Sequence, residues 1–149
     1  IEYRLRWDDI RYEPGELKAI AYKNGKKWSE DVVVTTGEPF TLQLEADRSR
    51  IAADGKDLAF ITVQVTDQKG RPVPDASLPV HFTIEGSGEL VATDNGNPAD
   101  MTPFPSLTRE TFNGQCLVIV RGESGKPGRI TIKADSPGLK ESKFILESD

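Results

Sequence analysis

The sequence contains one histidine, His81, and one cysteine, Cys116, and this scarcity excludes several kinds of site. A zinc site made of cysteine and histidine needs several such ligands at short spacings, so this chain cannot form one. No disulfide can form within the chain. A histidine-dependent catalytic triad would have to use His81, which alternates with two apolar neighbours and is expected on a surface or between sheets. Cys116 is expected to pack as a small buried hydrophobe.

Other common signatures are also missing. No stretch of the 149 residues approaches the roughly 18 apolar residues of a membrane span. There is no Gly-x-Ser-x-Gly, Walker A or Gly-x-Gly-x-x-Gly motif, and no helix-like segment follows Gly86-Ser87-Gly88. The formal net charge of −5 argues against a protein that neutralises phosphates. We therefore expect neither a nucleic-acid partner nor a membrane partner. Residues 1–7 carry three charges, so we also expect that no signal peptide remains.

Alternation of apolar and polar residues with period two is frequent, and it predicts half-buried β-strands. Four segments show it: 40–46, 59–65, 80–84 and 130–134. Residues 116–120 are apolar at every position, which predicts a central strand that is covered on both faces. Turn signals such as Asn113-Gly114 separate these segments, and no segment has helical periodicity. Seven or eight short strands within residues 38–149 predict an all-β fold, an immunoglobulin-like β-sandwich.

The first 37 residues do not fit inside that sandwich. They contain three strand-like segments, Tyr3–Trp7, Leu17–Tyr22 and Val32–Thr36, with an Asn24-Gly25 turn between the second and the third. Three strands are too few to form a core of their own. Gly37-Glu38-Pro39 has the composition of a short joint. The sequence therefore predicts two domains, residues 1–37 and residues 38–149.

Several motifs resemble those of glycoside hydrolase family 2 enzymes of the β-galactosidase type. The segment 12–26 is similar to the end of a β-sandwich in these enzymes, and residues 35–39 resemble the passage into a further C-terminal domain. The signature of that further domain is similar to segments 47–63, 70–76, 80–82, 86–88, 94–98, 112–114 and 138–139. The resemblance implies that residues 1–37 are the closing strands of a truncated preceding sandwich. The middle of the chain also resembles the immunoglobulin-like repeats of invasin and intimin adhesins.

The resemblance implies a parent enzyme that hydrolyses terminal β-glycosides, with two catalytic glutamates on a (β/α)₈ barrel. A chain of 149 residues cannot hold that barrel, so no catalytic residue is assigned. The expected function is that of a non-catalytic C-terminal region that supports the barrel or contacts between subunits, with homo-oligomerisation through residues 1–37. The family also implies a periplasmic, cell-surface or extracellular location. A carbohydrate-binding module and an adhesin-type spacer repeat are the alternatives.

A calcium site is one candidate at the loop that contains Asp94, Asn95, Asn97 and Asp100. Their side-chain oxygens are the ligand type that Ca²⁺ takes, and Gly96 allows a sharp bend between them. The EF-hand consensus fails, because its twelfth position, the bidentate glutamate, is Pro105 here. A hydrogen-bonded Asx turn is the competing interpretation, and the incomplete ligand set favours it.

Two further groups have a functional and a structural interpretation. Trp7, Trp28 and Tyr22 belong to an aromatic-rich N-terminal segment, where exposed rings would stack on sugars and bind carbohydrate. The structural interpretation places these rings in the core or interface of the preceding sandwich. The carboxylates of Asp47, Asp54 and Asp57 could bind calcium or act as an acid–base pair. Asp54-Gly55 favours a turn instead, with Asp57 capping backbone amides before the next strand.

Overall fold

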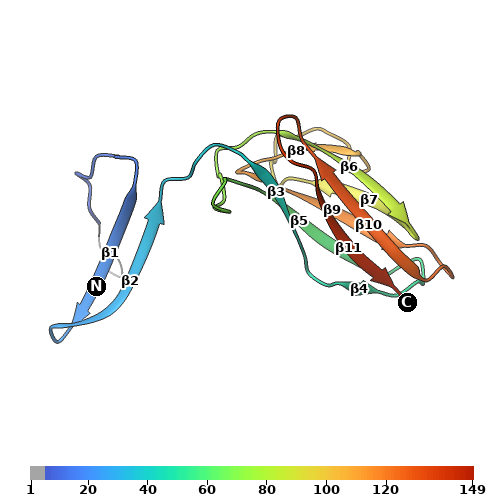
Figure 1. Ribbon diagram of the computed structural model, residues 1–149, viewed down its shortest axis with the longest axis horizontal. Coiled ribbons are helices and arrows are strands. Elements are labelled where there is room, and N and C mark those ends of the chain that lie inside the picture. Colours follow the sequence, from blue (N-terminus) through green and yellow to red (C-terminus); the bar gives the residue numbers. More distant parts are fainter. Residues whose placement is uncertain (1–5) are drawn as a thin grey trace. The chain divides into compact units, whose positions relative to one another are not determined.

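The computed structural model describes residues 6–149, and every regular element in this range is a β-strand (Figure 1). The all-β prediction is therefore confirmed. The chain forms two compact units, with Thr35 the last residue of the first and Thr36 the first residue of the second. Within residues 6–149 no helix has the length and apolar character needed to cross a membrane.

The first unit is a β-hairpin of β1 (Glu16–Lys23) and β2 (Lys26–Val34). Asn24 and Gly25 form its turn with φ angles of 51° and 71°, the positive values that a two-residue hairpin turn requires. This tight turn starts the second strand at Lys26 and not at Val32, so the sequence prediction placed that strand too late and extended it past Val34. The predicted strand Tyr3–Trp7 lies mostly outside the described residues, and Arg6 and Trp7 are not in a strand.

The second unit is a sandwich of two sheets. One has the order β4-β11-β10-β6-β8, made of Arg50–Ile51, Ser142–Ser148, Gly128–Asp135, Pro79–Gly86 and Thr108–Glu110. The other has the order β3-β5-β9-β7, made of Thr41–Ala46, Leu58–Thr66, Gln115–Gly122 and Gly88–Asp94. The strands pair antiparallel except β4, which runs parallel to β11. This unit has nine strands, β3 to β11, whereas the sequence predicted seven or eight. The difference arises because β4 and β8 are too short to show alternation.

The core lies between the two sheets and includes the residues that the alternation placed inward. On β5, Ala59, Ile61, Val63 and Val65 are all fully buried, as predicted. Eight further core residues are at most 1% exposed: Val80, Phe82, Val118, Val120, Ile130, Ile132, Ala134 and Leu146. Cys116 is also buried, and burial raises the pKa of its thiol to about 12, so it remains a neutral packing group.

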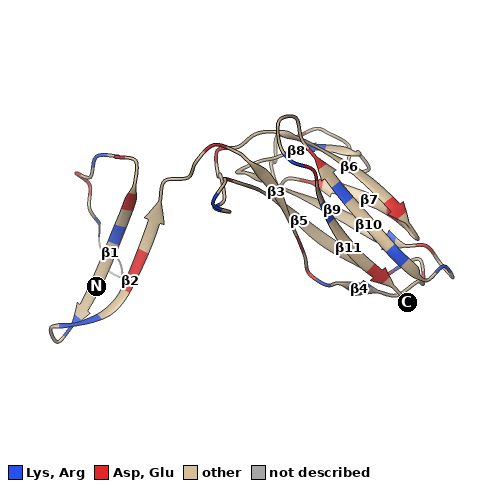
Figure 2. Cartoon of the chain, viewed as in Figure 1, with Lys and Arg blue, Asp and Glu red and all other residues tan. Residues whose placement is uncertain are grey.

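The two outer faces of the sandwich differ in character. Strands β6, β10 and β11 carry charged residues of both signs (Figure 2). On their outer face these residues form the pairs Lys133–Glu85 at 2.6 Å and Arg129–Glu147 at 3.4 Å. The outer face of β9 presents Leu117 and Ile119, which are only half-buried. β9 is central in its sheet, as expected, but no other element of residues 36–149 covers this face. The prediction of a strand covered on both faces is therefore wrong for this unit.

Gly86 and Gly88 allow the chain to pass from one sheet to the other between β6 and β7. A Cβ atom on Gly86 would lie 2.0 Å from the Arg129 carbonyl oxygen, and the φ angle of Gly86 is 96°. A Cβ atom on Gly88 would lie 2.6 Å from Ile130. The Gly86-Ser87-Gly88 motif thus serves close packing of the backbone at the sheet crossing.

Candidate functional site

The loop between β7 and β8, residues 95–107, is fixed by a series of side-chain hydrogen bonds. It begins with a series of side-chain caps: Asp94 Oδ1 accepts from the N–H of Asn95 and Gly96, and Asn95 Oδ1 accepts from the N–H of Asn97. Asn97 and Asp100 each accept from the N–H two residues further on. These are the hydrogen bonds of successive Asx turns, and they fix the course of the loop.

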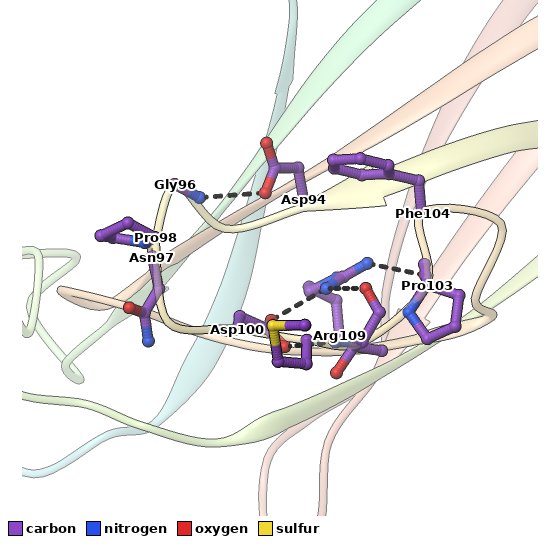
Figure 3. A pocket seen from close by; sticks show the side chains of 10 residues that line it. Asp94, Gly96, Asn97, Pro98, Asp100, Pro103, Phe104 and Arg109 are labelled. Carbon is purple, nitrogen blue, oxygen red and sulfur yellow. Dashed lines mark hydrogen bonds and ion pairs between the residues drawn. The ribbon is translucent and has the colours of Figure 1, made fainter.

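Arg109 of β8 fixes the backbone of this loop through hydrogen bonds from its side chain. Its side chain points inward from the edge strand and is 1% exposed. The guanidinium has five N–H donors, and each finds an acceptor in the loop or in β7. Nε donates to Thr93 Oγ1 at 3.2 Å. One terminal nitrogen donates to Asp100 Oδ2 at 2.8 Å and to the Thr102 carbonyl at 3.1 Å (Figure 3). The other donates to the carbonyls of Thr93 at 2.7 Å and Pro103 at 2.9 Å.

Asp100 is the counter-ion of this guanidinium. Its Oδ2 also accepts from Asn95 Nδ2 at 2.9 Å, and its Oδ1 accepts from the Thr102 N–H at 2.8 Å. The hydroxyl and backbone N–H of Thr102, together with Arg109, hold the pKa of Asp100 well below its ordinary value. Asp100 therefore stays ionised at neutral pH and cannot act there as a proton donor.

The outward surface of the same loop is apolar. Met101 is 89% exposed and Phe104 is 62% exposed, and prolines 98, 103 and 105 lie beside them in the chain. A depression of about 510 Å³ lies in this surface (Figure 3). It is lined by Asp94, Gly96, Asn97, Pro98, Asp100, Met101, Thr102, Pro103, Phe104 and Arg109. The surface offers a hollow and exposed apolar side chains, and the charges of Asp100 and Arg109 are already paired with each other. This arrangement is suited to binding a partner.

The four residues of the calcium prediction come together in this loop. Asp94, Asn95 and Asn97 cap backbone amides, and Asp100 pairs with Arg109. Within residues 6–149, no three His, Cys, Asp or Glu side chains are grouped so that they could hold a metal ion. A calcium site here stays a prediction. Arg109, which supplies the positive charge at this position, was missed by sequence reasoning because β8 has no apolar residues to mark its inward side.

The aromatic residues proposed for carbohydrate binding are all exposed. Trp7 is 63%, Tyr22 66% and Trp28 65% exposed. Tyr22 and Trp28 lie near the turn of the hairpin, whereas Trp7 lies in the coil before it. The Lys23 ammonium is 3.9 Å from the centroid of the Trp28 ring and occupies one of its faces. Carbohydrate binding by these residues stays a prediction.

The remaining candidates have structural partners. Asp54 Oδ1 accepts from the N–H of Asp57 and Lys56, and these two bonds hold the pKa of Asp54 below its ordinary value. Asp57 caps the N–H of Ala52 and Leu58, and Asp47 caps the N–H of Phe60. His81 is exposed and contacts Thr108 Oγ1 at 3.1 Å.

Asp67 is a second buried anchor, and it binds the segment at the beginning of the second unit. It is 2% exposed and accepts hydrogen bonds from the N–H of Gly37, Lys69 and Arg71, at 2.8–2.9 Å. The Arg71 guanidinium completes the site with a 2.8 Å ion pair. The Gly37 N–H, with those of Arg71 and Lys69 and the Arg71 side chain, holds the pKa of Asp67 well below its ordinary value. Asp67 thus fixes the segment that enters β3.

We expect Asp67→Asn to destabilise the second unit at pH 7 and to make its melting temperature less sensitive to acid pH. A carboxylate with a lowered pKa stabilises the fold fully above its ordinary pKa of about 4, and this stabilisation is lost as the pH falls through the folded-state pKa. The difference in melting temperature between wild type and variant should therefore shrink as the pH falls below about 4. Thermal unfolding followed by circular dichroism between pH 7 and pH 2.5 measures it. Asp75→Asn, at an exposed position, is the control; a difference that is constant with pH would contradict the assignment.

Comparison with known proteins agrees with this architecture. Residues 42–145 match the family model described as glycoside hydrolase family 2 C-terminal domain 5. The chain belongs to glycoside hydrolase family 2. Residues 1–29 match a second model, described as a domain of unknown function, DUF4982. The family predicted from the sequence motifs is thus confirmed.

Relatives of this family 2 chain are much longer proteins. The β-galactosidase BoGH2A of Bacteroides ovatus is 44% identical over 94% of this chain, which spans 16% of that protein. A β-glucuronidase of Formosa agariphila is 32% identical over 98% of this chain and 15% of its own length. The crystal structure of a family 2 member from Bacteroides cellulosilyticus superposes with a TM-score of 0.90 at 31% identity, over 94% of this chain and 18% of that one. The chain therefore corresponds to a small C-terminal part of family 2 hydrolases.

Proposed function

We propose that this chain is a non-catalytic accessory region of a family 2 glycosidase and that it supports the catalytic part of a longer polypeptide. The observation that carries the proposal is the match of residues 42–145 to a C-terminal domain of these hydrolases, in relatives of which the chain spans only 15–16%. The parent reaction is the hydrolysis of a terminal β-galactoside or β-glucuronide, and the expected location is the periplasm or the cell surface.

The second unit supports this role through what its ordered loop offers. Asp100 and Arg109 are held in a mutual ion pair, so neither is available as a catalytic acid or base. What the loop presents outward is Met101 and Phe104, which are contact groups and carry no reactive chemistry. A rigid loop with an apolar outer surface is typical of a region that packs against a neighbour.

An activity assay tests the proposal. The purified 149-residue chain should not hydrolyse chromogenic β-galactosides or β-glucuronides, whereas the longer protein should. Removal of residues 38–149 from the longer protein should lower its melting temperature or its yield of folded enzyme. Turnover by the chain alone that survives repurification and disappears when one of its own carboxylates is substituted would overturn the proposal.

The hairpin of the first unit supports a finer proposal on assembly. A two-stranded hairpin has two unpaired edges and is at best marginally stable alone. Leu17 and Val33 are 55% and 64% exposed, and Val32 and Val34 are each 38% exposed, so both faces of the hairpin are partly apolar. We infer that β1 and β2 pair with further strands in the parent, and that in the isolated chain they associate with a second copy.

Light scattering is expected to show association of the 149-residue chain and a monomer for a version that starts at Gly37. The shorter version retains every strand of the sandwich, β3 to β11, so it serves as its own folding control by circular dichroism. Two monomers at high concentration would contradict association through the hairpin.

A further inference from the structure

The loop 95–107 inverts the usual distribution of polar and apolar groups in a surface loop. Its polar groups are used internally, by the Asx caps and by the guanidinium of Arg109. Its exposed large apolar side chains are Met101 at 89%, Phe104 at 62% and Leu107 at 52%. Ordinary surface loops direct polar groups to water, and a cluster of exposed Met and aromatic side chains is typical of the centre of an interface.

The loop is also held in one conformation before any partner binds. Thr93, which is fully buried, donates its N–H to the Phe104 carbonyl at 2.6 Å and its hydroxyl to the Ser106 carbonyl at 3.0 Å. Arg109 binds the carbonyls of Thr102 and Pro103, which flank Phe104 on its N-terminal side. Because the backbone under the two apolar side chains is fixed, little conformational entropy is lost when they are covered.

The size of the patch indicates which partner covers it. A large side chain such as Phe covers roughly 150–250 Å², whereas a stable complex of two separate proteins buries about 800 Å² on each. Three exposed side chains are too few for that, but they suffice for a partner tethered in the same polypeptide, where the effective concentration is high. The relatives supply such a partner, since this chain spans 16% of the Bacteroides ovatus β-galactosidase.

We propose that the loop 95–107 is the surface through which this unit docks on another domain of the same polypeptide, with Met101 and Phe104 inserted into an apolar hollow of that domain. This inference rests on the proposed function. The docked domain needs no charge opposite Asp100 or Arg109, because these two side chains already form an ion pair at 2.8 Å. The contact is therefore expected to be insensitive to salt.

A pair of stability measurements tests the proposal. The double variant Met101→Ser/Phe104→Ser should leave the melting temperature of the 149-residue chain unchanged, because both side chains are exposed there. In the longer protein the same variant should lower the temperature at which this unit unfolds, by roughly 2–4 °C for each kcal/mol of docking energy that is lost. Ile145→Ser, at a position 43% exposed on the charged outer face, is the control, and any loss of stability that it causes should be the same in the 149-residue chain and in the longer protein. Equal effects of the two variants in the longer protein would overturn the docking surface.

Photo-crosslinking identifies the occupant. Phe104→p-benzoylphenylalanine in the longer protein should crosslink to a segment that precedes this chain, within one molecule, and the same residue at position 145 should not. A crosslink between two copies, or none above the level of position 145, would overturn the proposal. Deletion of residues 38–149 tests the accessory role separately, so a deletion that destabilises the enzyme without any crosslink from position 104 would refute the docking loop alone.

Discussion

Replacement of Ile61 by aspartate is expected to unfold the second unit. Ile61 is fully buried on β5, where it pairs with Val118 of β9 on one side and with Ala46 of β3 on the other. A carboxylate at this position has no cation or hydrogen-bond donor in the apolar core. Burying it costs several kcal/mol, against a total stability of typically 5–15 kcal/mol. The far-ultraviolet circular dichroism spectrum should lose its sheet signal at 25 °C, and Val63→Asp should behave alike.

Thr62→Lys provides the comparison within the same strand. Thr62 is exposed on the outer face of β5, directly opposite Glu45 of β3, so this substitution introduces a charge one position away beside a charge of opposite sign and should change the stability little. An Ile61→Asp protein that melts within a degree or two of wild type would show that the inward face of β5 has been assigned wrongly.

Replacement of Arg109 by methionine is expected to cost about 3–5 kcal/mol of stability, the usual effect of removing one partner of a buried ion pair. The substitution leaves Asp100 without its counter-ion and deprives the carbonyls of Thr93, Thr102 and Pro103 of a donor. Urea denaturation measures the loss. Hydrogen exchange should show faster exchange of the Thr93 and Thr102 amides, which hold the loop, before the unit unfolds globally.

One further variant separates geometry from charge at this site, and one at a surface arginine is the control. Arg109→Lys restores the positive charge but not the fork of donors, so it should recover only part of the lost stability. Arg121→Met removes an arginine that pairs with Glu89 at 2.6 Å, but this pair is on the surface and should contribute within about 1 kcal/mol. If Arg109→Met were no more damaging than Arg121→Met, Arg109 would not be the anchor of the loop.

The sandwich was predictable because a half-buried strand leaves a direct trace in the sequence. In the segment 59–65 every second residue is apolar, and each of these residues is fully buried in the structure. The strand boundaries in the hairpin were less predictable, since all of β1 and β2 is exposed and no buried face imposes a period. There the Asn24-Gly25 turn was the reliable signal, because its φ angles are restricted by local sterics.

The loop 95–107 shows where sequence reasoning reached its limit. The acidic and amide residues were recognised as a group, but their partner Arg109 follows Asp100 by nine positions and reaches it only through the fold. No local pattern distinguishes an arginine that points into the unit from one that points to water. The exposure of Met101 and Phe104 was likewise hidden, because the prolines around them indicate only a turn and not which side chains face outward.

The position of β11 between β4 and β10 has a consequence for how the unit acquires its structure during synthesis. The Ser142 hydroxyl donates to the Leu42 carbonyl at 2.5 Å, and the N–H of Glu147 donates to the Ser49 carbonyl at 3.0 Å. These contacts join residues about one hundred positions apart. At a translation rate of about 5–20 residues per second, the first strands wait roughly 5–20 s for β11 to emerge.

During that interval Leu146, which is fully buried in the finished unit, is not yet available to complete the core beside its strand partner Ile130. Sheets built from such distant pairings fold on the millisecond-to-second scale, and their incomplete forms expose apolar strand edges. The nascent chain is therefore most prone to aggregate just before residues 142–148 are added.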